Sequence, residues 1–468
     1  MGTISDKLMR IINTKEDIRQ ALISKGYDVP TSIPFKEYAK MISDLPCRVD
    51  SFPDIEGIVA RYSALGLTNE QMAANPVWVD KTGNGHDLQM KNFAWKEGSG
   101  ISDIYPGALV FDGVDDWAGC DNLPLLPKEK GYSIIALRNW ITRYDATQYK
   151  RPLISNLDTN DEGAFLIEYR KDENVNDVTG SYNIYIDDNN PITWQTSSSY
   201  NGQIIKKGTS KSTNKLCICK TYFDQLSNYA NASIWEIVIL DHDATEEELT
   251  KIKDYFVKTY PWLFPDQAWT VTGKTNEDED RATIANITGN SNDLVLSNFG
   301  FVEGSGYNEE GEYAGYLVTD GVDDKVVSAE SIAFTDTWTI ITDTVFLGKV
   351  SVASGILASN IFTVYNYQGS GTIAVTMGEG GSSLRVITSS IKAFSSDGTI
   401  YDAEWNEYHV EIGTIRALER LLKIGTSSNE TSYFCQLAFK FLGIYNNQIL
   451  SKDDCIKAYN YLQTLKAK

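Results

Sequence analysis

The chain contains one passage twice, and this duplication limits its possible architecture more than any other feature. Residues 82–100 (TGNGHDLQMKNFAWKEGSG) and 288–306 (TGNSNDLVLSNFGFVEGSG) share 11 identities over 19 positions without a gap. A second related pair follows each copy, ALVFDGVDD at 108–116 and YLVTDGVDD at 316–324. Solenoid and propeller units recur every ~20 to 50 residues, so a repeat this long indicates two copies of a whole domain.

The two copies also end alike, which places the domain boundaries. A β-rich run leads into the segments ATEEELTKIKDYF and LSKDDCIKAYNYL, each of which begins with a Thr or Ser helix cap. A chain of 468 residues exceeds what one hydrophobic core usually organises. We therefore predict a helical segment at residues 1–50 and two domains at 51–264 and 265–468.

Both domains are expected to be mainly β. Segments such as IWEIVIL (234–240) and TWTIITDTVFL (337–347) are rich in β-branched and aromatic residues, and polar turns separate them. Runs of strands with a single helix at the end of each copy favour antiparallel sandwiches over a parallel α/β sheet. The predicted fold is two tandem antiparallel jelly-roll sandwiches preceded by a small helical segment.

The order of these motifs resembles a known family. The GNGH turn at 83–86, the FDGVDD turn at 111–116 and the closing strand with its capped helix are similar to laminin G-like, concanavalin A-like jelly rolls. The second copy departs from this pattern at Ser291, Asn292 and Thr319. The resemblance implies a sandwich that can bind carbohydrate.

The first 46 residues resemble short helical segments of bacteriophage fibre and tail proteins. The matching stretches are INTKEDIRQALISKG and PFKEYAKMI, and the whole combination is similar to virion proteins of crAss-like gut bacteriophages. This resemblance implies a virion structural protein, a head or tail fibre or a capsid decoration. Such a protein is assembled in the host cytoplasm, lies on the virion surface, contacts other virion proteins and can bind host or mucosal glycans.

The helical segment carries a candidate oligomerisation seam. Its apolar residues recur at steps of three and four, with a lysine at the missing position, as in helices that pair. The seam residues are Ile4, Leu8, Ile11, Ile18 and Leu22. We expect a homo-oligomer, a trimer first and a dimer second, although a helical hairpin docked on its own chain is an equal alternative.

Charge and hydropathy exclude several classes of partner. The 42 basic and 63 acidic residues give a net charge of −21, which repels a phosphate backbone. No apolar run reaches the roughly 18 to 20 residues of a membrane span, and the first residues lack a signal peptide's apolar core. We therefore expect no nucleic acid and no membrane insertion. The six cysteines form no disulfide framework and are interpreted as small core residues.

The residues needed for common hydrolytic chemistry are missing from the sequence. Retaining glycosidases on this fold place carboxylates on alternate residues of one strand, and no E-x-D-x-E triplet occurs. The three histidines, His86, His242 and His409, lie in no nucleophile or zinc motif. We therefore predict no catalytic residue and no enzymatic activity. The alternatives are a glycan-degrading depolymerase on the same fold and a bacterial carbohydrate-binding adhesion module.

The repeated aspartate turns could ligate a metal. Asp112, Asp115 and Asp116, and their counterparts at 320, 323 and 324, offer carboxylates of the kind that calcium prefers, and some laminin G-like domains carry calcium. Aspartates that bond backbone amides in a turn explain the same pattern without an ion. We favour the turn and expect no cofactor and no bound metal.

Four aromatic residues are candidates for sugar stacking. They lie in or beside polar stretches of the first copy, where exposed rings could pack on the apolar face of a sugar. The four are Trp140, Tyr144, Trp194 and Tyr200. For each ring we favour a position in the hydrophobic core over a role in ligand binding.

Overall fold

The computed structural model describes most of the chain beyond residue 51. The described residues are 52–126, 131–142, 150–157, 166–170, 192–196, 213–223, 228–348, 354–359, 362–366, 373–377, 383–386, 388, 390–413, 419–426 and 434–467, together with Lys15 and Arg19. Both of the latter are helical. Met1–Asp54 and Ile55–Lys468 form separate compact units, and the boundary predicted between residues 264 and 265 stays a prediction.

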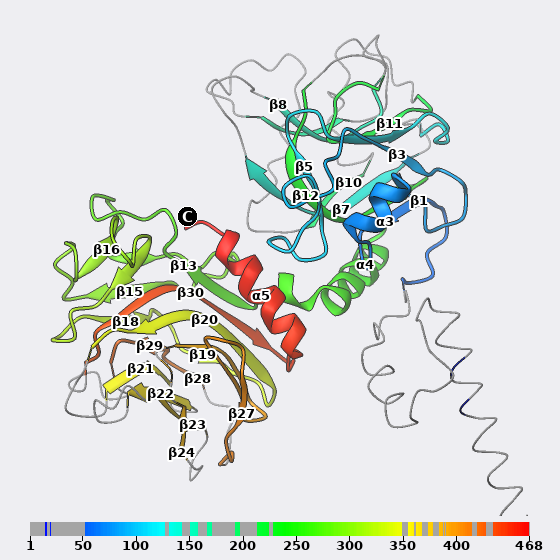
Figure 1. Ribbon diagram of the computed structural model, residues 1–468. Coiled ribbons are helices and arrows are strands. Elements are labelled where there is room, and N and C mark those ends of the chain that lie inside the picture. Colours follow the sequence, from blue (N-terminus) through cyan, green and yellow to red (C-terminus); the bar gives the residue numbers. More distant parts are fainter. Residues whose placement is uncertain are drawn as a thin grey trace, which may run out of the picture. The chain divides into compact units, whose positions relative to one another are not determined.

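Two antiparallel sheets build the first sandwich (Figure 1). One has the strand order β10-β7-β12-β5-β4, with β1 also paired to β12, and the other has the order β2-β3-β6-β11-β8-β9. The first sheet contains β1 (Ile58–Ser63), β4 (Gly100–Ile101), β5 (Leu109–Asp112), β7 (Ser133–Thr142), β10 (Ile192–Thr196) and β12 (Asn231–Leu240). The second contains β2 (Val77–Trp78), β3 (Leu88–Lys91), β6 (Trp117–Cys120), β8 (Lys150–Ser155), β9 (Leu166–Arg170) and β11 (Leu216–Ile218).

Two larger antiparallel sheets build the second sandwich. The first has the order β16-β17-β30-β20-β25-β26-β27, with β13 paired to β30, and the second has the order β14-β15-β18-β29-β21-β22-β23-β24. The first contains β13 (Gln267–Thr270), β16 (Gly306–Asn308), β17 (Tyr316–Val318), β20 (Trp338–Phe346), β25 (Ile391–Ser395), β26 (Thr399–Asp402), β27 (Glu407–His409) and β30 (Leu437–Asn446). The second contains β14 (Thr283–Ile284), β15 (Leu294–Ser297), β18 (Lys325–Ser328), β21 (Ser354–Ala358), β22 (Phe362–Asn366), β23 (Ile373–Met377), β24 (Ser383–Val386) and β29 (Lys423–Ile424). A separate pair joins β19 (Ile332–Ala333) to β28 (Glu419–Arg420).

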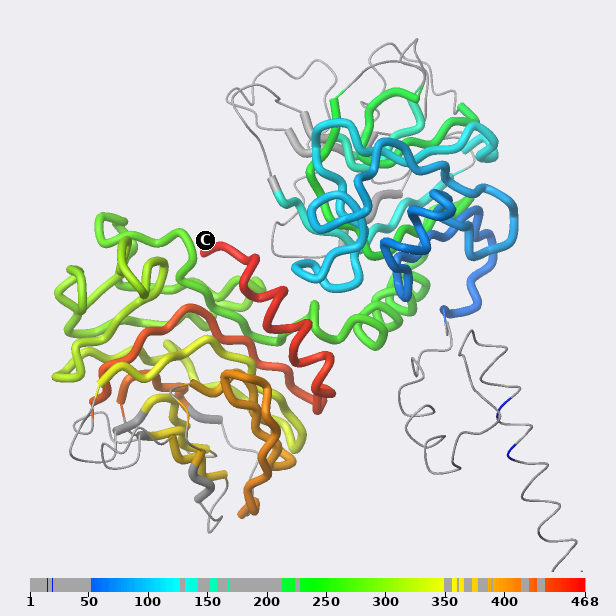
Figure 2. Tube along the Cα trace, viewed as in Figure 1, coloured from blue at the N-terminus to red at the C-terminus, as the bar shows by residue number. Residues whose placement is uncertain are grey.

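The two sandwiches have the same topology. Strands β2-β3-β6-β11-β8-β9 correspond one by one to β14-β15-β18-β29-β21-β22, and the other pair of sheets corresponds in the same way. The repeated passage leads into β3 and β4 in the first copy, and into β15 and β16 in the second. Our prediction that it occupies equivalent positions is confirmed, as is the prediction of a mainly β, antiparallel fold. Figure 2 shows that the chain completes one sandwich before it builds the next.

Short helices follow from local sequence signals. Within residues 52–467, the described helices are α3 (Asn69–Ala74), α4 (Glu246–Thr259), α5 (Lys452–Thr464) and the 3-10 turn η2 (Pro261–Leu263). Thr245 and Glu248 form the expected capping box of α4, and Ser451 caps α5 by accepting a bond from the Asp454 amide. Each terminal helix therefore begins at the residue that the sequence indicates.

Each sandwich encloses its own hydrophobic core. In β3 buried and exposed residues alternate, because one face of that strand meets solvent. In β12 nine of ten residues are buried, so its residues are mostly apolar and do not alternate, with Ser233 and Glu236 as buried polar exceptions. Cysteines 120, 217, 219, 435 and 455 are buried and none of them forms a disulfide, as expected of small core residues, while Cys47 lies outside the described residues. Burial raises the pKa of the Cys435 thiol to about 12, so the thiol stays protonated.

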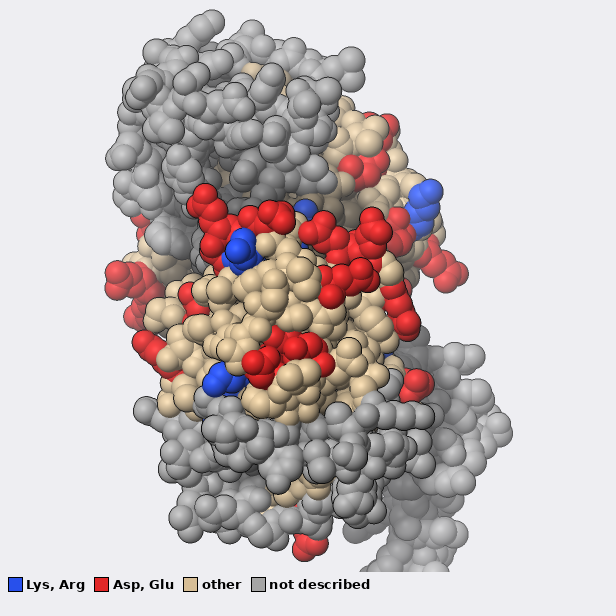
Figure 3. All heavy atoms as spheres, turned by 90° about the vertical axis from the view of Figure 1, so that its left-hand side faces the viewer, with Lys and Arg blue, Asp and Glu red and all other residues tan. Residues whose placement is uncertain are grey.

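The surface reflects the net charge of the chain. Asp and Glu side chains are far more numerous than Lys and Arg on the face shown in Figure 3. No described helix has the length and apolarity needed to cross a membrane.

Candidate functional site

The repeated passage begins with a loop that is held by its own side chains. In the first copy the Asp80 carboxylate accepts bonds from the Arg61 amide at 3.1 Å, the Thr82 amide at 3.0 Å and the Thr82 hydroxyl at 2.8 Å. Asn84 then donates to the carbonyl of Val59 at 2.9 Å. These bonds fix the loop against β1, which explains the Thr-Gly-Asn sequence without any ligand.

A buried aromatic side chain holds the next residue of the loop in both copies. The Tyr62 hydroxyl donates to the His86 carbonyl at 2.6 Å, and the Trp269 indole donates to the Asn292 carbonyl at 2.9 Å. Tyr62 and Trp269 lie on the first strand of their respective sandwiches. The backbone of this residue therefore has the same structural role in both copies.

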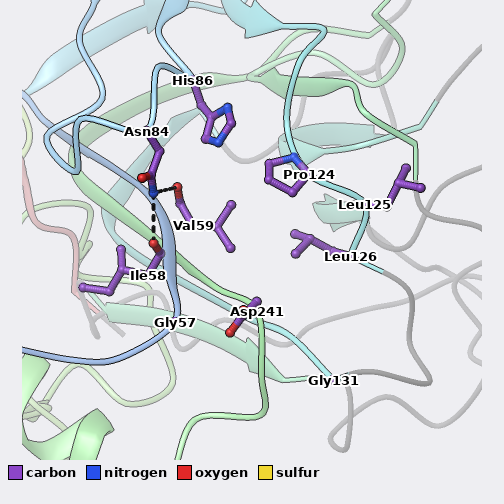
Figure 4. Close-up of a pocket in the computed structure, with 10 residues that line it drawn as sticks. All are labelled: Gly57, Ile58, Val59, Asn84, His86, Pro124, Leu125, Leu126, Gly131 and Asp241. Carbon is purple, nitrogen blue, oxygen red and sulfur yellow. Dashed lines mark hydrogen bonds between the residues drawn. The ribbon is translucent and has the colours of Figure 1, made fainter.

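A pocket of about 520 Å³ opens beside this loop in the first sandwich (Figure 4). It is lined by Gly57, Ile58, Val59, Asn84, His86, Pro124, Leu125, Leu126, Gly131 and Asp241. These residues come from β1, from the loop before β3 and from the segments after β6, before β7 and after β12. Its volume lies within the roughly 300 to 1,000 Å³ of small-molecule sites.

The pocket combines apolar walls with a few polar groups. Figure 4 shows the side chains of Asn84, His86, Pro124 and Asp241 around Val59. The Nδ1 atom of His86 is buried and has no hydrogen-bond partner among the described residues. A buried polar atom without a partner is costly, and the imidazole that carries it lines the pocket.

Asp241 forms the acidic rim of the pocket. Its Oδ1 lies 3.2 Å from Nδ1 of His242, and Nε2 of His242 lies 3.1 Å from Oε1 of Glu248. Burial opposes the charged imidazole, but hydrogen bonds to these two carboxylates raise the pKa of His242 overall. Gly57 has a φ of +77° and no room for a Cβ, because Asp241 Oδ1 and His242 Nδ1 occupy that space. The rim is therefore a charged cluster that packs closely on β1.

In the second copy an asparagine, Asn292, stands at the position of His86. Asn292 replaces His86 in the repeat, and its side-chain amide donates to the Glu330 carbonyl at 3.1 Å while its oxygen accepts from the Glu330 amide at 2.9 Å. Asn292 is only 6% exposed. A residue that is paired on both sides to the main chain has no free polar atom to offer a ligand.

The aspartate turns are built identically in the two copies. Asp112 Oδ1 accepts from the amide of Val114 at 2.8 Å and that of Asp115 at 3.2 Å, and Asp116 Oδ2 accepts from the Asp112 amide at 3.1 Å. Asp320 and Asp324 repeat these bonds. The hydrogen bonds account for the repeated sequence, in line with the favoured structural interpretation.

The same turns bring three carboxylates together. One oxygen from each of Asp112, Asp115 and Asp116 lies within 4.8 Å of the others, and the same holds at 320, 323 and 324. Burial raises the pKa of Asp116 and of Asp324 to about 6. Calcium needs ionised carboxylates with free lone pairs, whereas Asp112 already uses one oxygen for backbone amides. The absence of a bound metal therefore stays a prediction, with calcium as its alternative.

The structure changes the view of the predicted sugar-stacking residues. Trp140 is 5% exposed and belongs to the core, because it lies on central strand β7 opposite the small residue Ala232. Burial favours the core role of Trp140 over the role in sugar stacking. Trp194 lies on β10, next to β7, and its side chain is outside the described residues, as are Tyr144 and Tyr200. The seam residues Ile4, Leu8, Ile11, Ile18 and Leu22 also lie outside them.

Sequence reasoning did not select the pocket residues. In the sequence His86 is part of the GNGH turn and lies outside catalytic motifs, and nothing connects it with Leu125 or Asp241. The one available signal was the departure of the second copy at residue 292, since a substitution inside an otherwise retained loop marks a side chain that the loop does not need.

Comparisons with known proteins give no family. No family model matches the chain, and no curated protein matches it. Among solved structures, Trypanosoma rangeli sialidase in complex with sialic acid aligns with a TM-score of 0.29 and 11% identity over 50% of this chain and 41% of the sialidase. The ligand-binding domain of botulinum neurotoxin serotype D in complex with N-acetylneuraminic acid aligns with a TM-score of 0.30 and 9% identity over 84% and 96%.

The similarity to sialidase structures corrects the prediction of no enzymatic activity. Sialidases are enzymes, and several structures of the Trypanosoma rangeli protein match this chain. The prediction that the chain has no enzymatic activity is therefore contradicted and is withdrawn. With TM-scores near 0.3, these similarities assign neither an activity nor a ligand to this chain.

Proposed function

We propose that this chain is a glycan-binding protein and that the pocket beside His86 is its saccharide site. The observation that carries the proposal is the imidazole of His86, which lines the pocket and whose Nδ1 has no hydrogen-bond partner among the described residues. A saccharide hydroxyl can donate to or accept from an imidazole nitrogen, and the C–H face of a sugar ring can pack on Pro124 and on Leu125, which is 64% exposed. The Asn84 side chain and the Asp241 carboxylate supply further hydrogen-bonding groups at the edge.

Glycan-array screening followed by calorimetry on the full chain tests this proposal. We expect His86→Ala to weaken binding of the best saccharide by about tenfold or more, since one lost hydrogen bond in a desolvated site contributes about 1 to 2 kcal/mol. His409→Ala is the matched control, because His409 is exposed in the second sandwich and pairs with Glu407. Equal losses in both variants, or no binding to any glycan, would refute the site. Mass spectrometry of the bound glycans shows whether they are also cleaved.

We also propose that the protein acts on a bacteriophage virion, as a head or tail fibre or surface decoration. The resemblance of residues 1–46 to fibre and tail proteins supports this role, and a surface decoration that binds glycans would hold a particle near its host or at mucus. Deleting residues 1–46 should then yield a soluble monomer in sedimentation that no longer binds particles. A truncated chain that keeps its oligomeric state and still binds particles would show that the interface lies elsewhere.

A further inference from the structure

A second cluster of polar and aromatic residues lies on the outer face of the sheet that α5 covers. Four adjacent strands, β17-β30-β20-β25, carry in turn Tyr316, Lys440, Asp343 and Lys392. Trp405 follows β26, and Tyr459 comes from α5. We call these six residues the cationic platform.

The carboxylate of Asp343 lies at the centre of the platform. It is 6% exposed and accepts a bond from the Tyr316 hydroxyl at 2.9 Å. Burial raises the pKa of Asp343, while hydrogen bonds from tyrosines and the charges of Lys440 and Lys392 oppose the rise. One buried carboxylate therefore faces two ammonium groups from the strands on either side.

The two lysines are paired with rings instead of acids. Lys440 Nζ lies 5.3 Å from the centre of the Tyr316 ring, and Lys392 Nζ lies 4.8 Å from the Tyr459 ring and 5.3 Å from the Trp405 ring. Among the described residues, neither ammonium group forms an ion pair or a hydrogen bond. Both side chains are half-buried, so each keeps donors that can reach a ligand.

Trp405 is held in an unfavourable backbone conformation. Its φ is +63°, a region that bulky residues rarely adopt. The Asp402 carboxylate maintains the turn, because its oxygens accept bonds from the Glu404 amide at 2.9 Å, the Asn406 amide at 2.8 Å and the Tyr408 hydroxyl at 3.0 Å. Strain that is over-determined in this way is typical of functional positions, and here it places the indole against Lys392 and Tyr459.

We propose that the cationic platform binds a saccharide that carries a carboxylate. Lys440 and Lys392 lie two strands apart, roughly 10 Å at the backbone, and can donate to the two sides of one anionic sugar residue. The half-buried rings of Trp405 and Tyr316 can contact its apolar face. With Asp343 ionised, the platform has a single net positive charge within a chain of net charge −21. This charge favours a monocarboxylate over a polyphosphate, which the acidic surface repels.

This proposal rests on the glycan-binding function of the chain but uses a different site. The probes are two matched pairs, trigalacturonic acid with its methyl ester and 3′-sialyllactose with lactose, titrated into the full-length protein by calorimetry. We expect the acidic member of at least one pair to bind about tenfold more tightly than its neutral counterpart, and added salt to reduce the difference. The two pairs distinguish uronic from sialic acids.

Three variants locate the binding. Lys392→Met and Lys440→Met keep the apolar stem and should each weaken acidic binding roughly fivefold, whereas Asp343→Asn should strengthen it by a similar factor, because a repelling charge is removed. Lys466→Met, at an exposed lysine, is the matched control. A gain of affinity in Asp343→Asn cannot arise from unfolding, so this variant remains informative if a lysine variant is unstable.

Several results would overturn the assignment. These are equal binding of the charged and neutral probes, or unchanged acidic binding in Lys392→Met, Lys440→Met and Asp343→Asn. If His86→Ala removes acidic binding while the lysine variants retain it, the acid binds in the pocket, and the platform is wrong although glycan binding stands. If His86→Ala removes only the neutral glycan, both sites are supported.

Discussion

The equivalent loops of the two sandwiches show how one fold separates structural from functional residues. Both loops keep the same backbone bonds, with a buried aromatic side chain donating to the carbonyl of residue 86 or 292. They differ in the side chain at that position. Asn292 is bonded on both sides to Glu330, whereas His86 leaves a buried nitrogen facing a pocket. A duplicated scaffold can therefore retain its geometry while one copy opens a site.

The faces covered by the terminal helices differ in a similar way. Under α4, Arg61 and Glu236 form an ion pair at 2.5 Å with side-chain exposures of 6% and 0%, and Tyr260 donates to Glu236 at 2.8 Å. Next to α5, Lys392 and Lys440 stay half-exposed beside Asp343. A fully buried pair stabilises its interface, whereas an open cluster of charges keeps donors for a ligand.

The largest expected effect tests this second contrast. Glu236→Ala should lower the free energy of unfolding by about 3 to 5 kcal/mol, because the buried guanidinium of Arg61 loses the carboxylate that balances its charge. Asp343→Asn should change it by much less, since the Tyr316 hydroxyl can still donate to the amide oxygen. Urea denaturation followed by circular dichroism measures both. Similar losses in the two variants would mean that the faces do not differ in kind.

A smaller effect tests the contrast between the loops. Asn292→Ala should lower the free energy of unfolding by about 1 to 2 kcal/mol, because the Glu330 amide and carbonyl lose their partner. His86→Ala should stay within about 0.5 kcal/mol of the wild type, since no described residue bonds its ring. Thermal melts of both variants provide the measurement. A large loss in His86→Ala would indicate a structural role for that side chain.

The pH dependence of the free energy of unfolding tests a feature that the two copies should share, the aspartate turn. An unperturbed aspartate has a pKa near 4, whereas Asp116 and Asp324 titrate at about 6 in the folded chain. The folded state therefore binds protons more tightly, and each group lowers the free energy of unfolding as the pH rises from about 4 to about 6. We expect Asp116→Asn and Asp324→Asn each to reduce this loss, by roughly 1 to 3 kcal/mol since one pKa unit corresponds to about 1.4 kcal/mol. Different pH profiles in the two variants would show that the turns are not equivalent.

The smallest expected effect concerns calcium. If backbone amides account for the aspartate turns, exchanging EDTA for millimolar calcium should leave the melting temperature at neutral pH unchanged. A ligand that binds only the folded state raises that temperature by mass action. A clear rise that Asp115→Asn removes would establish calcium binding at the first turn, and Asp323→Asn asks the same question of the second.

Local sequence patterns determined the strands, the helix starts and the position of the repeat. The apolar run of β12, the caps at Thr245 and Ser451 and the glycine-rich turns are recognisable because each depends on neighbours within a few residues. The acidic surface and the buried cysteines also follow from composition and alternation. Exposure of a single ring is harder to infer, as Trp140 shows, since a polar neighbourhood does not reveal that β7 is paired on both sides.

Only the tertiary structure decided where chemistry can occur. The pocket needs β1, the His86 loop, the Pro124 segment and Asp241 at one place, and the cationic platform needs four strands whose order in the sheet differs from their order in the chain. Sheet order and the packing of loops depend on contacts between residues far apart in sequence, which no local pattern encodes. The duplicated passage determined that there are two similar scaffolds and that only the first has a histidine in this loop, and long-range packing decided that the histidine lines a pocket.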